Sequence, residues 1–432
     1  MEALLLQDLS GFFENARQAR KWLVALPLQY NTERIYKGAH AYIHLTGVCK
    51  VACEHCMYSS DYTARLPKPS LNSLEVDLAN KYINDSGSQK LTISGGGEPF
   101  LKLNALLSLI SKSFVPHIEI DTAGDWAISA NKTVKILSSL SKALEENPNK
   151  PVLVLRISAD KFHSVIAKNP VSISNYANII RYWSEQEWGF KLALRGLLLE
   201  DDETSILIAR AVLGNLEKVN DWNKLLVLPN GKTIPFTFNV LRFTGKGVNY
   251  VNSYSAKTIP MLDYYRPFHD ENDNLVLGMA INDAVDGSYY KIKGLSITID
   301  YDGSLFIYTA TAPDMRANLV THNFVQSIDH FYRDPITHVL LSDGLYSLLR
   351  LVAEIDEGIV TKSLQQNDMT AVVASLLSNE NVLLYATLRS VQMLIKAGKI
   401  GVSDNTASLK FLSDVDKNIL LGVAQVSYRK SR

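Results

Sequence analysis

Cysteine is scarce in this chain, with three residues among 432. A small and odd number of cysteines argues against the disulfide framework that is typical of secreted domains. The N-terminal segment shows no secretory signal either, because Glu2 and Asp8 precede its first arginine, the reverse of the charge order of a signal peptide. We therefore expect a cytoplasmic protein.

An excess of charge of either sign is also missing. Lysine plus arginine number 44, and aspartate plus glutamate number 44, so the overall charge does not predict a nucleic-acid or anionic-membrane surface. No uncharged apolar run reaches the ~18 residues that a membrane-spanning helix needs. Nucleic acid and membrane are therefore not expected as partners, and the sequence leaves the oligomeric state open. The apolar fraction of 47% is ordinary for a folded protein with a sizeable core.

Short β-rich runs alternate with longer helical patterns from residue 41 onward, which is the spacing of βα units around a parallel sheet. The six runs begin at Ala41, Lys90, His117, Val152, Phe190 and Phe236. Six such units predict an α/β fold, a partial (β/α)6 TIM-like barrel that stays open instead of reaching the full eight units.

Segments on both sides of the barrel have other patterns. The predicted units are an N-terminal amphipathic helix in 1–38, the partial barrel in 39–248, a loop and small antiparallel sheet in 249–343, and a helical C-terminal cap in 344–432. We expect the first helix to pack on the barrel through its apolar stripe. The small sheet is expected from alternating residues on both sides of Asp302-Gly303, which is a hairpin signal.

All three cysteines lie on one short loop directly after the first predicted strand, where Cys49, Cys53 and Cys56 form the pattern C-x3-C-x2-C. Loops that follow the strands of a βα barrel form its functional mouth. Three thiolates there can bind either zinc or an iron–sulfur cluster. A closed zinc site needs a fourth protein ligand, which His44 or His55 could supply, whereas a cluster can leave one iron open.

A run of glycines ends the second predicted strand, where Gly95-Gly96-Gly97 precedes Glu98. Glycine lets a backbone approach a ligand closely because no Cβ stands in the way. The cysteine pattern and this GGE segment follow consecutive strands in the same order as in the radical S-adenosylmethionine (radical SAM) enzymes, which the chain therefore resembles.

The resemblance implies an enzyme with one 4Fe-4S cluster and S-adenosylmethionine (SAM) as cofactors. Cys49, Cys53 and Cys56 would bind three irons, and the amino and carboxylate groups of SAM would bind the fourth. Reductive cleavage of SAM would give a 5′-deoxyadenosyl radical that abstracts hydrogen from the substrate. The cofactors carry this chemistry, while the protein orients them. A flavodoxin or ferredoxin would supply the electron.

The resemblance also implies residues that bind SAM. Glu98, with Gly96 and Gly97 beside it, would bind the methionine ammonium in a charge-assisted pair. Arg195 interrupts an apolar strand where related enzymes have a basic residue that meets the SAM carboxylate. An ion pair inside the barrel is the alternative for this arginine.

The nucleoside half of SAM has less specific expected contacts. His55 stands where the family often has an aromatic residue beside adenine, and Thr122 and Ser158 stand where ribose contacts are common. The segment 241–247 resembles the sixth-strand exit that closes around adenine. His163 could be an acid or base toward the substrate, with a plain surface histidine as the alternative, so the catalytic residues remain unknown.

The hairpin segment resembles the SPASM or twitch extension of relatives, which usually supplies cysteines for auxiliary clusters. Tyr308 stands about where the first of those cysteines would be, so no auxiliary cluster is expected. The expected substrate is a peptide or protein side chain or a small polar metabolite. The alternatives are a non-catalytic Cys3His zinc barrel and a SAM-binding sensor.

Overall fold

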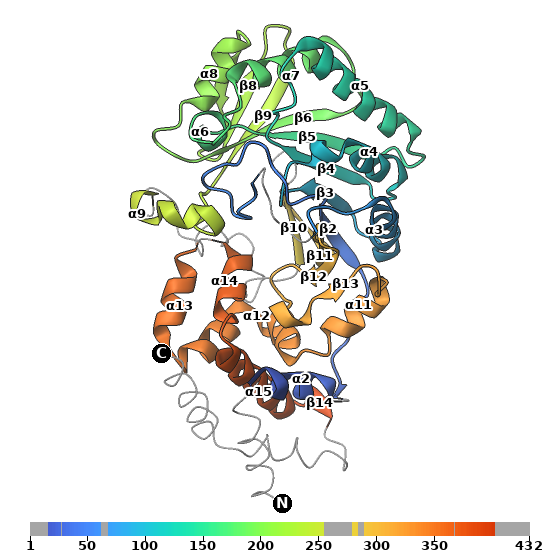
Figure 1. Ribbon diagram of the computed structural model, residues 1–432, viewed down its shortest axis with the longest axis vertical. Coiled ribbons are helices and arrows are strands. Elements are labelled where there is room, and N and C mark those ends of the chain that lie inside the picture. Colours follow the sequence, from blue (N-terminus) through green and yellow to red (C-terminus); the bar gives the residue numbers. More distant parts are fainter. Residues whose placement is uncertain are drawn as a thin grey trace, which may run out of the picture.

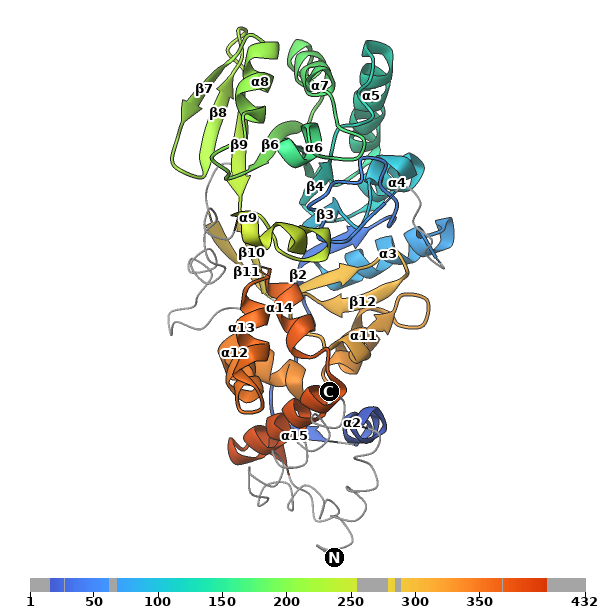
Figure 2. The same cartoon turned by 60° about the vertical axis from the view of Figure 1, so that its left-hand side comes forward.

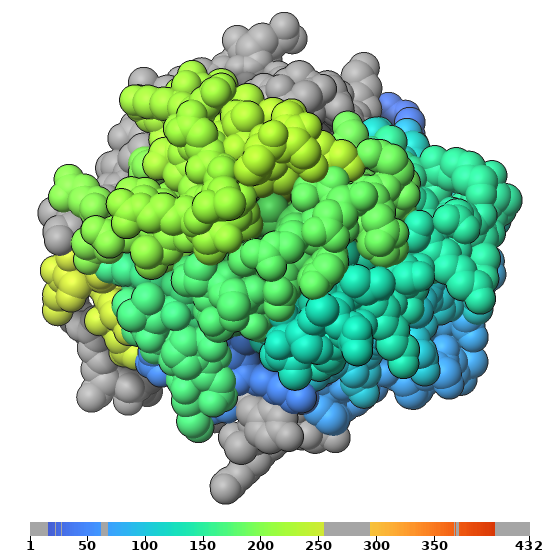
Figure 3. Space-filling view, turned by 90° about the horizontal axis from the view of Figure 1, so that it is seen from above, coloured from blue at the N-terminus to red at the C-terminus, as the bar shows by residue number. Residues whose placement is uncertain are grey.

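The computed structural model describes residues 16–26, 28–61, 68–254, 279–283, 289–366 and 368–401. A barrel of strands with outer helices forms the upper part of Figure 1, and a group of helices forms the lower part. Seen from the barrel end, the barrel segments follow one another across the surface in chain order, from blue through teal to yellow-green (Figure 3).

Six parallel strands form the barrel, and they are neighbours in the order in which they occur along the chain. They are β2 (Gly38–His44), β3 (Lys90–Ser94), β4 (His117–Thr122), β5 (Val152–Ser158), β6 (Lys191–Leu197) and β9 (Thr233–Asn239). The helices between them are α3 (Ser73–Ser86), η1 (Pro99–Lys102), α4 (Leu103–Lys112), α5 (Ala130–Glu146), α6 (Lys161–Ser164), α7 (Ile173–Glu185) and α8 (Thr204–Ala211). The predicted α/β class with six βα-type strands is confirmed.

Apolar and polar side chains alternate along these strands, which explains which face of each strand packs in the core and which faces the barrel interior. In β5, Leu153, Leu155 and Ile157 are buried in the hydrophobic core on one face. The other face carries Arg156 and Ser158, because successive strand residues point to opposite sides. The same alternation in β4 gives the barrel a polar interior within an apolar shell.

One hairpin was not predicted. β7 (Asn215–Lys218) and β8 (Asn223–Val227) pair antiparallel with each other, and β8 extends the sheet beyond β9. The segment NLEK of β7 shows no apolar alternation, since three of its four residues are exposed. A strand at the edge of a sheet with both faces near solvent leaves little hydrophobic signal.

The predicted hairpin at Asp302-Gly303 is present between β11 (Tyr289–Ile299) and β12 (Ser304–Ile307). Gly303 has a φ of 88°, which glycine adopts readily. β10 (Met279–Asp283) and β13 (Ala317–Asn318) complete this antiparallel part. It is continuous with the barrel, since β11 pairs in parallel with β2.

The N-terminal helix packs differently from the prediction. α2 (Ala16–Ala25) lies against α15 (Glu380–Lys396) near the lower end of Figure 1, and the expected contact with the barrel is wrong. Its apolar stripe, which includes Ala19 and Leu23, joins a separate core with Leu384 and Leu388. An apolar stripe specifies burial but not a partner. β1 (Gln29–Tyr30) pairs with β14 (Ile400–Gly401) beside it, and the earlier part of the predicted helix lies outside the described residues.

The C-terminal part is helical, as predicted. Its elements are η5 (Pro313–Met315), α11 (Phe324–Phe331), α12 (Pro335–Ala353), α13 (Glu357–Leu364), α14 (Met369–Leu376) and α15. By length and composition, α12 is the one described helix that would suffice to cross a membrane. Its chain breaks from helical geometry at Gly344, and 67% of its most apolar stretch is buried inside the protein, which is also what a core helix shows.

Figure 2 shows η2 (Gly245–Tyr250) and α9 (Val251–Tyr254) between the barrel and these helices. The Phe243 amide donates a hydrogen bond to the Gln366 carbonyl at 2.8 Å, and Arg242 forms an ion pair with the buried Asp368 at 2.8 Å. The exit of the sixth parallel strand is thus tied to the loop between α13 and α14.

Candidate functional site

The three cysteines border one pocket at the carboxyl ends of the barrel strands. The pocket is lined by Cys49, Cys53, Cys56, Tyr58, Ser60, Ser94, Gly95, Gly96, Gly97, Glu98, Asp121, Thr122, Ala123, Ser158 and His163. The loop turns tightly, with the Cys56 amide donating to the Cys53 carbonyl at 3.2 Å. The pocket lies where a βα barrel places its chemistry, and it brings the cysteine and glycine motifs together.

Neighbouring segments hold the cysteine loop through its backbone. The Glu98 amide donates to the Val48 carbonyl at 2.9 Å, and the Lys246 amide donates to the Cys56 carbonyl at 3.0 Å. The Asn169 side chain donates to the Lys50 carbonyl at 2.7 Å. Three different loops therefore fix the position of the sulfurs.

The glycines serve this packing. A Cβ on Gly97 would lie 2.0 Å from the Val48 carbonyl oxygen, and one on Gly245 would lie 2.5 Å from the Cys56 carbonyl oxygen. Gly96 has a φ of 84°, which disfavours other residues. The close approach at Gly97 is thus to the chain's own cysteine loop. The prediction that Gly96 and Gly97 contact a ligand stays a prediction, as does a contact of 241–247 with adenine.

Glu98 is buried at the bottom of the site, with 2% of its surface exposed. One carboxylate oxygen accepts from the Thr122 hydroxyl at 2.7 Å and the Phe100 amide at 3.2 Å, and the other accepts from the Ala123 amide at 3.0 Å. Burial, together with the nearby Asp125 charge, raises the pKa of Glu98 to about 8.

The surroundings of Glu98 fit an ammonium ligand. Among the described residues no lysine, arginine or histidine forms an ion pair with it, and a buried carboxylate without a cation is unfavourable. A positive group in the pocket would offset this burial, and the oxygen that holds only the Ala123 amide can accept another hydrogen bond. The donor set therefore matches the amino group of SAM.

Thr122 forms a hydrogen bond to Glu98 in this structure. Its hydroxyl gives its proton to Glu98 and accepts from the Gly124 amide and the Trp126 indole, both at 3.1 Å. A hydroxyl has one donor and two acceptor sites, so all are used. Thr122 therefore positions the Glu98 carboxylate. While these bonds persist, its hydroxyl has no hydrogen-bonding site left for the predicted ribose contact.

Ser158 and Arg195 lie side by side, because β5 and β6 pair them in register. Ser158 lines the pocket, where a ribose contact stays a prediction. The Arg195 Nε atom is buried without a hydrogen-bond partner, and no ion pair of this arginine is found in the part of the chain that the structure describes. The Arg195 charge also contributes to lowering the pKa of the buried Glu119 inside the barrel. Its contact with the SAM carboxylate and the alternative of an ion pair within the barrel both stay predictions.

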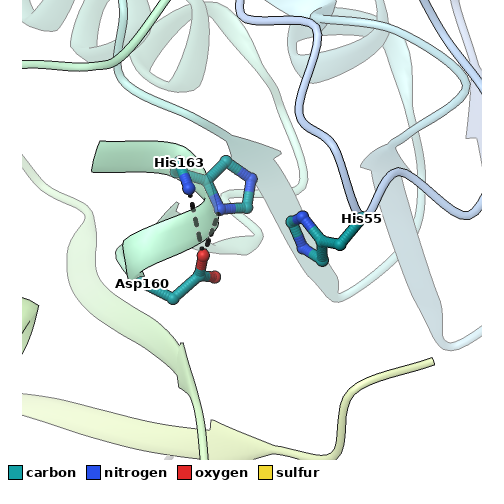
Figure 4. Close-up of side chains that lie close together, drawn as sticks. All are labelled: His55, Asp160 and His163. Carbon is teal, nitrogen blue, oxygen red and sulfur yellow. Dashed lines mark hydrogen bonds and ion pairs between the residues drawn. The ribbon is translucent and has the colours of Figure 1, made fainter. Parts of the chain in front are cut away.

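His55 does not point freely into the pocket. Its ring packs at 4.6 Å from the Phe162 ring and edge-on at 5.1 Å from the His163 ring. Burial lowers the pKa of His55 to about 4, and its Nδ1 atom has no hydrogen-bond partner. Figure 4 shows the imidazoles of His55 and His163 next to each other, with Asp160 bonded to His163.

The zinc alternative requires ligands closer together than the cysteines are. Two ligands on one tetrahedral zinc lie about 3.8 Å apart, because each Zn–S bond is ~2.3 Å. In the described residues, the one group of ligating atoms within 4.8 Å of one another belongs to His55, Asp160 and His163, and the three cysteines form no such group. His44, the other proposed ligand, instead pairs with Asp300 at 3.1 Å. A cluster fits better, since each of its cysteines binds a different iron.

Sequence reasoning missed the polar groups just below the pocket. The Arg156 guanidinium binds Asp121 through two hydrogen bonds of 2.6 and 2.5 Å and also pairs with Glu119 at 3.0 Å. The Ser94 hydroxyl donates to Asp121 at 2.8 Å. These residues were detectable as charges at alternate positions of otherwise apolar strands, which places them on one face.

Comparisons with known proteins agree with this geometry. Residues 37–142 match the model of the family described as 4Fe-4S single cluster domain. No curated protein matches the chain. Among solved structures, Streptococcus suis SuiB bound to its precursor peptide SuiA is similar, with 15% identity, a TM-score of 0.44, and coverage of 72% of this chain and 68% of that chain.

SuiB bound to S-adenosylmethionine is similar at 13% identity and a TM-score of 0.40, covering 71% and 66% of the two chains. The matched family segment contains the cysteine loop, Glu98 and Thr122, which are the residues that the pocket brings together. Residues 37–142 are therefore similar to a 4Fe-4S single cluster domain, in agreement with the three cysteines on one loop of the pocket.

Proposed function

We propose that the enzyme cleaves SAM reductively at a single cluster held by Cys49, Cys53 and Cys56, and that it activates a C–H bond of a peptide side chain. When bound, the cluster and SAM supply a 5′-deoxyadenosyl radical, which takes a hydrogen atom from the substrate. The observation that carries the proposal is the buried Glu98 beside the cysteine loop in one pocket, which forms no ion pair within the described part of the chain.

The chain's own residues would bind and orient SAM. Glu98 would accept from the ammonium, held in place by the Thr122 hydroxyl and the Phe100 and Ala123 amides. Arg195 would donate to the carboxylate, and Ser158 beside it would contact the ribose. Ser158 and Arg195 lie on barrel strands, and Glu98 is held by three hydrogen bonds, so these groups would be positioned before SAM binds.

The polar barrel interior supports a polar substrate. Glu119, Asp121 and Arg156 form a charged network directly below the pocket, and Tyr42 packs its ring against the Tyr308 ring at 6.2 Å. The sheet extension β10–β13 joins the barrel at β2, next to the cysteine loop. We propose that this extension corresponds to the SPASM or twitch region of relatives, with Tyr308 in place of a cluster cysteine.

All three cysteines of the sequence are assigned to one cluster, so the proposal includes no auxiliary cluster and no cysteine that quenches a product radical. The electron would come from a flavodoxin or ferredoxin in the cytoplasm. Peptide substrates are proposed over small metabolites because a sheet extension joins the barrel at β2, the strand that leads into the cysteine loop.

Anaerobic reconstitution with iron and sulfide, followed by SAM and a strong reductant, tests the proposed chemistry. Wild type should bind about four irons per chain and release 5′-deoxyadenosine slowly, since one cubane needs four irons. Cys53→Ala should lose the iron and the release together. Glu98→Gln should keep the iron but bind SAM about 100-fold more weakly, because it removes one partner of a buried charge pair.

Glu187→Gln is the matched control, since this glutamate is 90% exposed and pairs only with Lys232 in the described ion pairs. It should behave as wild type. One zinc per chain without 5′-deoxyadenosine, or full activity in Cys53→Ala, would disprove the proposal.

The substrate class needs a separate experiment. Deuterium-labelled cell extract is divided into a peptide fraction and a small-molecule fraction, and each is incubated with the reconstituted enzyme. Deuterium should appear in 5′-deoxyadenosine with the peptide fraction and disappear after that fraction is treated with protease. Deuterium transfer from the small-molecule fraction alone would contradict the peptide assignment while leaving the SAM chemistry intact.

A further inference from the structure

Asp121 is the part of the charged barrel network that reaches the pocket. Its side chain is 18% exposed and lines the pocket, whereas the Glu119 side chain is 6% exposed and is not among the lining residues. Both side chains leave β4 on the interior face, because strand residues two apart share a face. Of these two carboxylates, Asp121 is therefore the one that a bound molecule can contact.

Arg156 and Ser94 hold the Asp121 carboxylate in place. Its Oδ1 atom accepts from Arg156 Nε at 2.6 Å, and its Oδ2 atom accepts from Arg156 Nη2 at 2.5 Å and from the Ser94 hydroxyl at 2.8 Å. A carboxylate has about four lone-pair sites on its two oxygens, so these three bonds leave one site on Oδ1. The carboxylate is thus fixed in position and can accept one more hydrogen bond.

The charge of the network is already balanced. Glu119 pairs with Lys90 at 3.4 Å and with Arg156 at 3.0 Å, and Arg156 also pairs with Asp121. Two carboxylates therefore face two cations, and Arg195 adds a further positive charge that acts on Glu119. A ligand cation beside Asp121 would be repelled by this positive surplus. The free site of Asp121 consequently favours an uncharged N–H or O–H donor.

Tyr58 presents the opposite kind of group in the same pocket. Its ring packs edge-on against the His44 ring at 4.9 Å, and a Cβ on Gly95 would lie 2.7 Å from the Tyr58 Cε2 atom, so the ring lies directly on the residue that follows Ser94. Tyr58 lines the pocket, is 46% exposed, and forms no hydrogen bond through its hydroxyl within the described part of the chain. The pocket thus offers a free donor as well as a free acceptor.

We propose that Asp121 and Tyr58 bind the peptide backbone of the substrate, with Asp121 accepting from an amide N–H and Tyr58 donating to a carbonyl oxygen. The inference rests on the peptide substrate of the proposed function and names the residues that select it. A peptide backbone supplies both an uncharged N–H and a carbonyl acceptor, whereas an ammonium group or a carboxylate supplies only one of the two. Arg156 and Ser94 are positioning residues, because they act through Asp121.

A contact with SAM would be a different use of Asp121. Thr122, whose hydroxyl holds Glu98, is the next residue of β4, and successive strand residues point to opposite faces. Asp121 therefore leaves the strand on the face opposite to the hydroxyl that holds Glu98. This direction favours a contact with the substrate, and the affinity for SAM distinguishes the two uses.

The test uses the reconstituted enzyme and the deuterium-labelled peptide fraction. The readouts are iron per chain, SAM affinity, and the amount of peptide fraction that gives half-maximal deuterium transfer to 5′-deoxyadenosine. In Asp121→Asn this amount should rise about tenfold, because the substrate loses a hydrogen bond to a charged group. Tyr58→Phe, which keeps the ring on Gly95, should raise it about fivefold, because a neutral hydrogen bond is lost. Iron content and SAM affinity should match wild type in both variants.

Asp329→Asn and Tyr36→Phe are the matched controls. Asp329 also pairs with an arginine, Arg34, at 2.6 Å and accepts from a hydroxyl, that of Tyr36, but neither residue lines the pocket. Tyr36 is 45% exposed, close to the value for Tyr58. Both controls should need the wild-type amount of peptide fraction.

The outcomes separate this inference from the proposed function. Wild type that releases 5′-deoxyadenosine but takes no deuterium from the peptide fraction would disprove the peptide assignment and this inference with it. Deuterium transfer in wild type with unchanged amounts in both variants would overturn the inference alone. A SAM affinity that falls together with the peptide response would place the residues in the SAM site and would also overturn it. If Asp121→Asn fails to fold, an unchanged amount in Tyr58→Phe overturns the inference.

Discussion

At the scale of single residues, charges buried in the barrel decide what the interior can hold. Glu119 is buried on the interior face, yet it pairs with Arg156 at 3.0 Å and Lys90 at 3.4 Å. Burial raises its pKa, but the charges of Arg156 and Lys90, together with that of Arg195, outweigh burial and lower the pKa of Glu119 to about 2. Glu98, by contrast, has its pKa raised by burial and by the nearby Asp125 charge, and no ion pair offsets this in the described residues. The two glutamates, Glu119 within β4 and Glu98 at the start of η1, thus have opposite charge preferences.

The low pKa of Glu119 predicts a pH dependence of stability. Because the folded pKa lies below the unfolded value of 4.5, the pair stabilises the protein fully above about pH 4.5 and loses its contribution as the pH falls toward 2. Glu119→Gln should lower the free energy of unfolding by about 3 kcal/mol at pH 7, since it leaves Lys90 without its partner. Urea unfolding between pH 3 and 7 measures both effects.

As the pH falls from 7 to 3, the free energy of unfolding of Glu119→Gln should decrease less than that of wild type. Glu187→Gln, an exposed position, should reproduce the wild-type curve. Parallel curves for Glu119→Gln and wild type over pH 3 to 4.5 would contradict the role given to this ion pair.

At the scale of elements, the site depends on how closely loops pack on the cysteine loop. A Cβ on Gly97 would overlap the Val48 carbonyl, so Gly97→Ala should displace the loop and reduce iron binding several-fold after reconstitution. Gly231 also has a φ above zero, 83°, but a Cβ there would meet open space. Gly231→Ala should therefore cost about 1 kcal/mol in unfolding free energy and keep its iron.

Iron per chain and urea unfolding distinguish the two glycines. Normal iron content in Gly97→Ala would show that the loop accommodates the methyl group and that the packing does not position the cysteines.

Some of these elements could be predicted from the sequence and others could not, and the difference has physical reasons. The six barrel strands carry apolar runs that must be buried, and the two motifs follow strands whose ends share one edge of the barrel, so both were foreseeable. The hairpin β7–β8 was not foreseeable, because β7 is mostly exposed and its sequence shows no alternation of apolar and polar residues. The hydroxyl of Thr122 also could not be assigned from the sequence, since only the three-dimensional position of Glu98 shows that it is already used.

At the scale of the whole molecule, Arg20 joins segments that are far apart in the chain. This arginine is 1% exposed and binds Asp314 at 2.8 Å and the fully buried Asp334 at 2.9 Å. It also hydrogen-bonds Thr387 in α15. A single guanidinium therefore fastens α2 to the helical part below the barrel.

Replacing Arg20 should destabilise the contact between α2 and the C-terminal helices before it affects the barrel. Arg20→Ala leaves two carboxylates without their cation and should cost about 3–5 kcal/mol, with faster hydrogen exchange in α15 and iron content close to wild type. Arg17→Ala, which removes an exposed pair with Glu380, should cost at most about 1 kcal/mol. Unchanged exchange in α15 would refute the link between Arg20 and this region.

The pairing of β2 with β11 has a consequence for how the protein is made. β2 carries the cysteine loop at its end, but its neighbour on one side is a strand more than 240 residues later in the chain. A ribosome adds ~5–20 residues per second, so this edge of the first strand stays unpaired for roughly tens of seconds during synthesis. The strand that ends in the cysteine loop therefore gains its neighbour on this side only after β11 has left the ribosome.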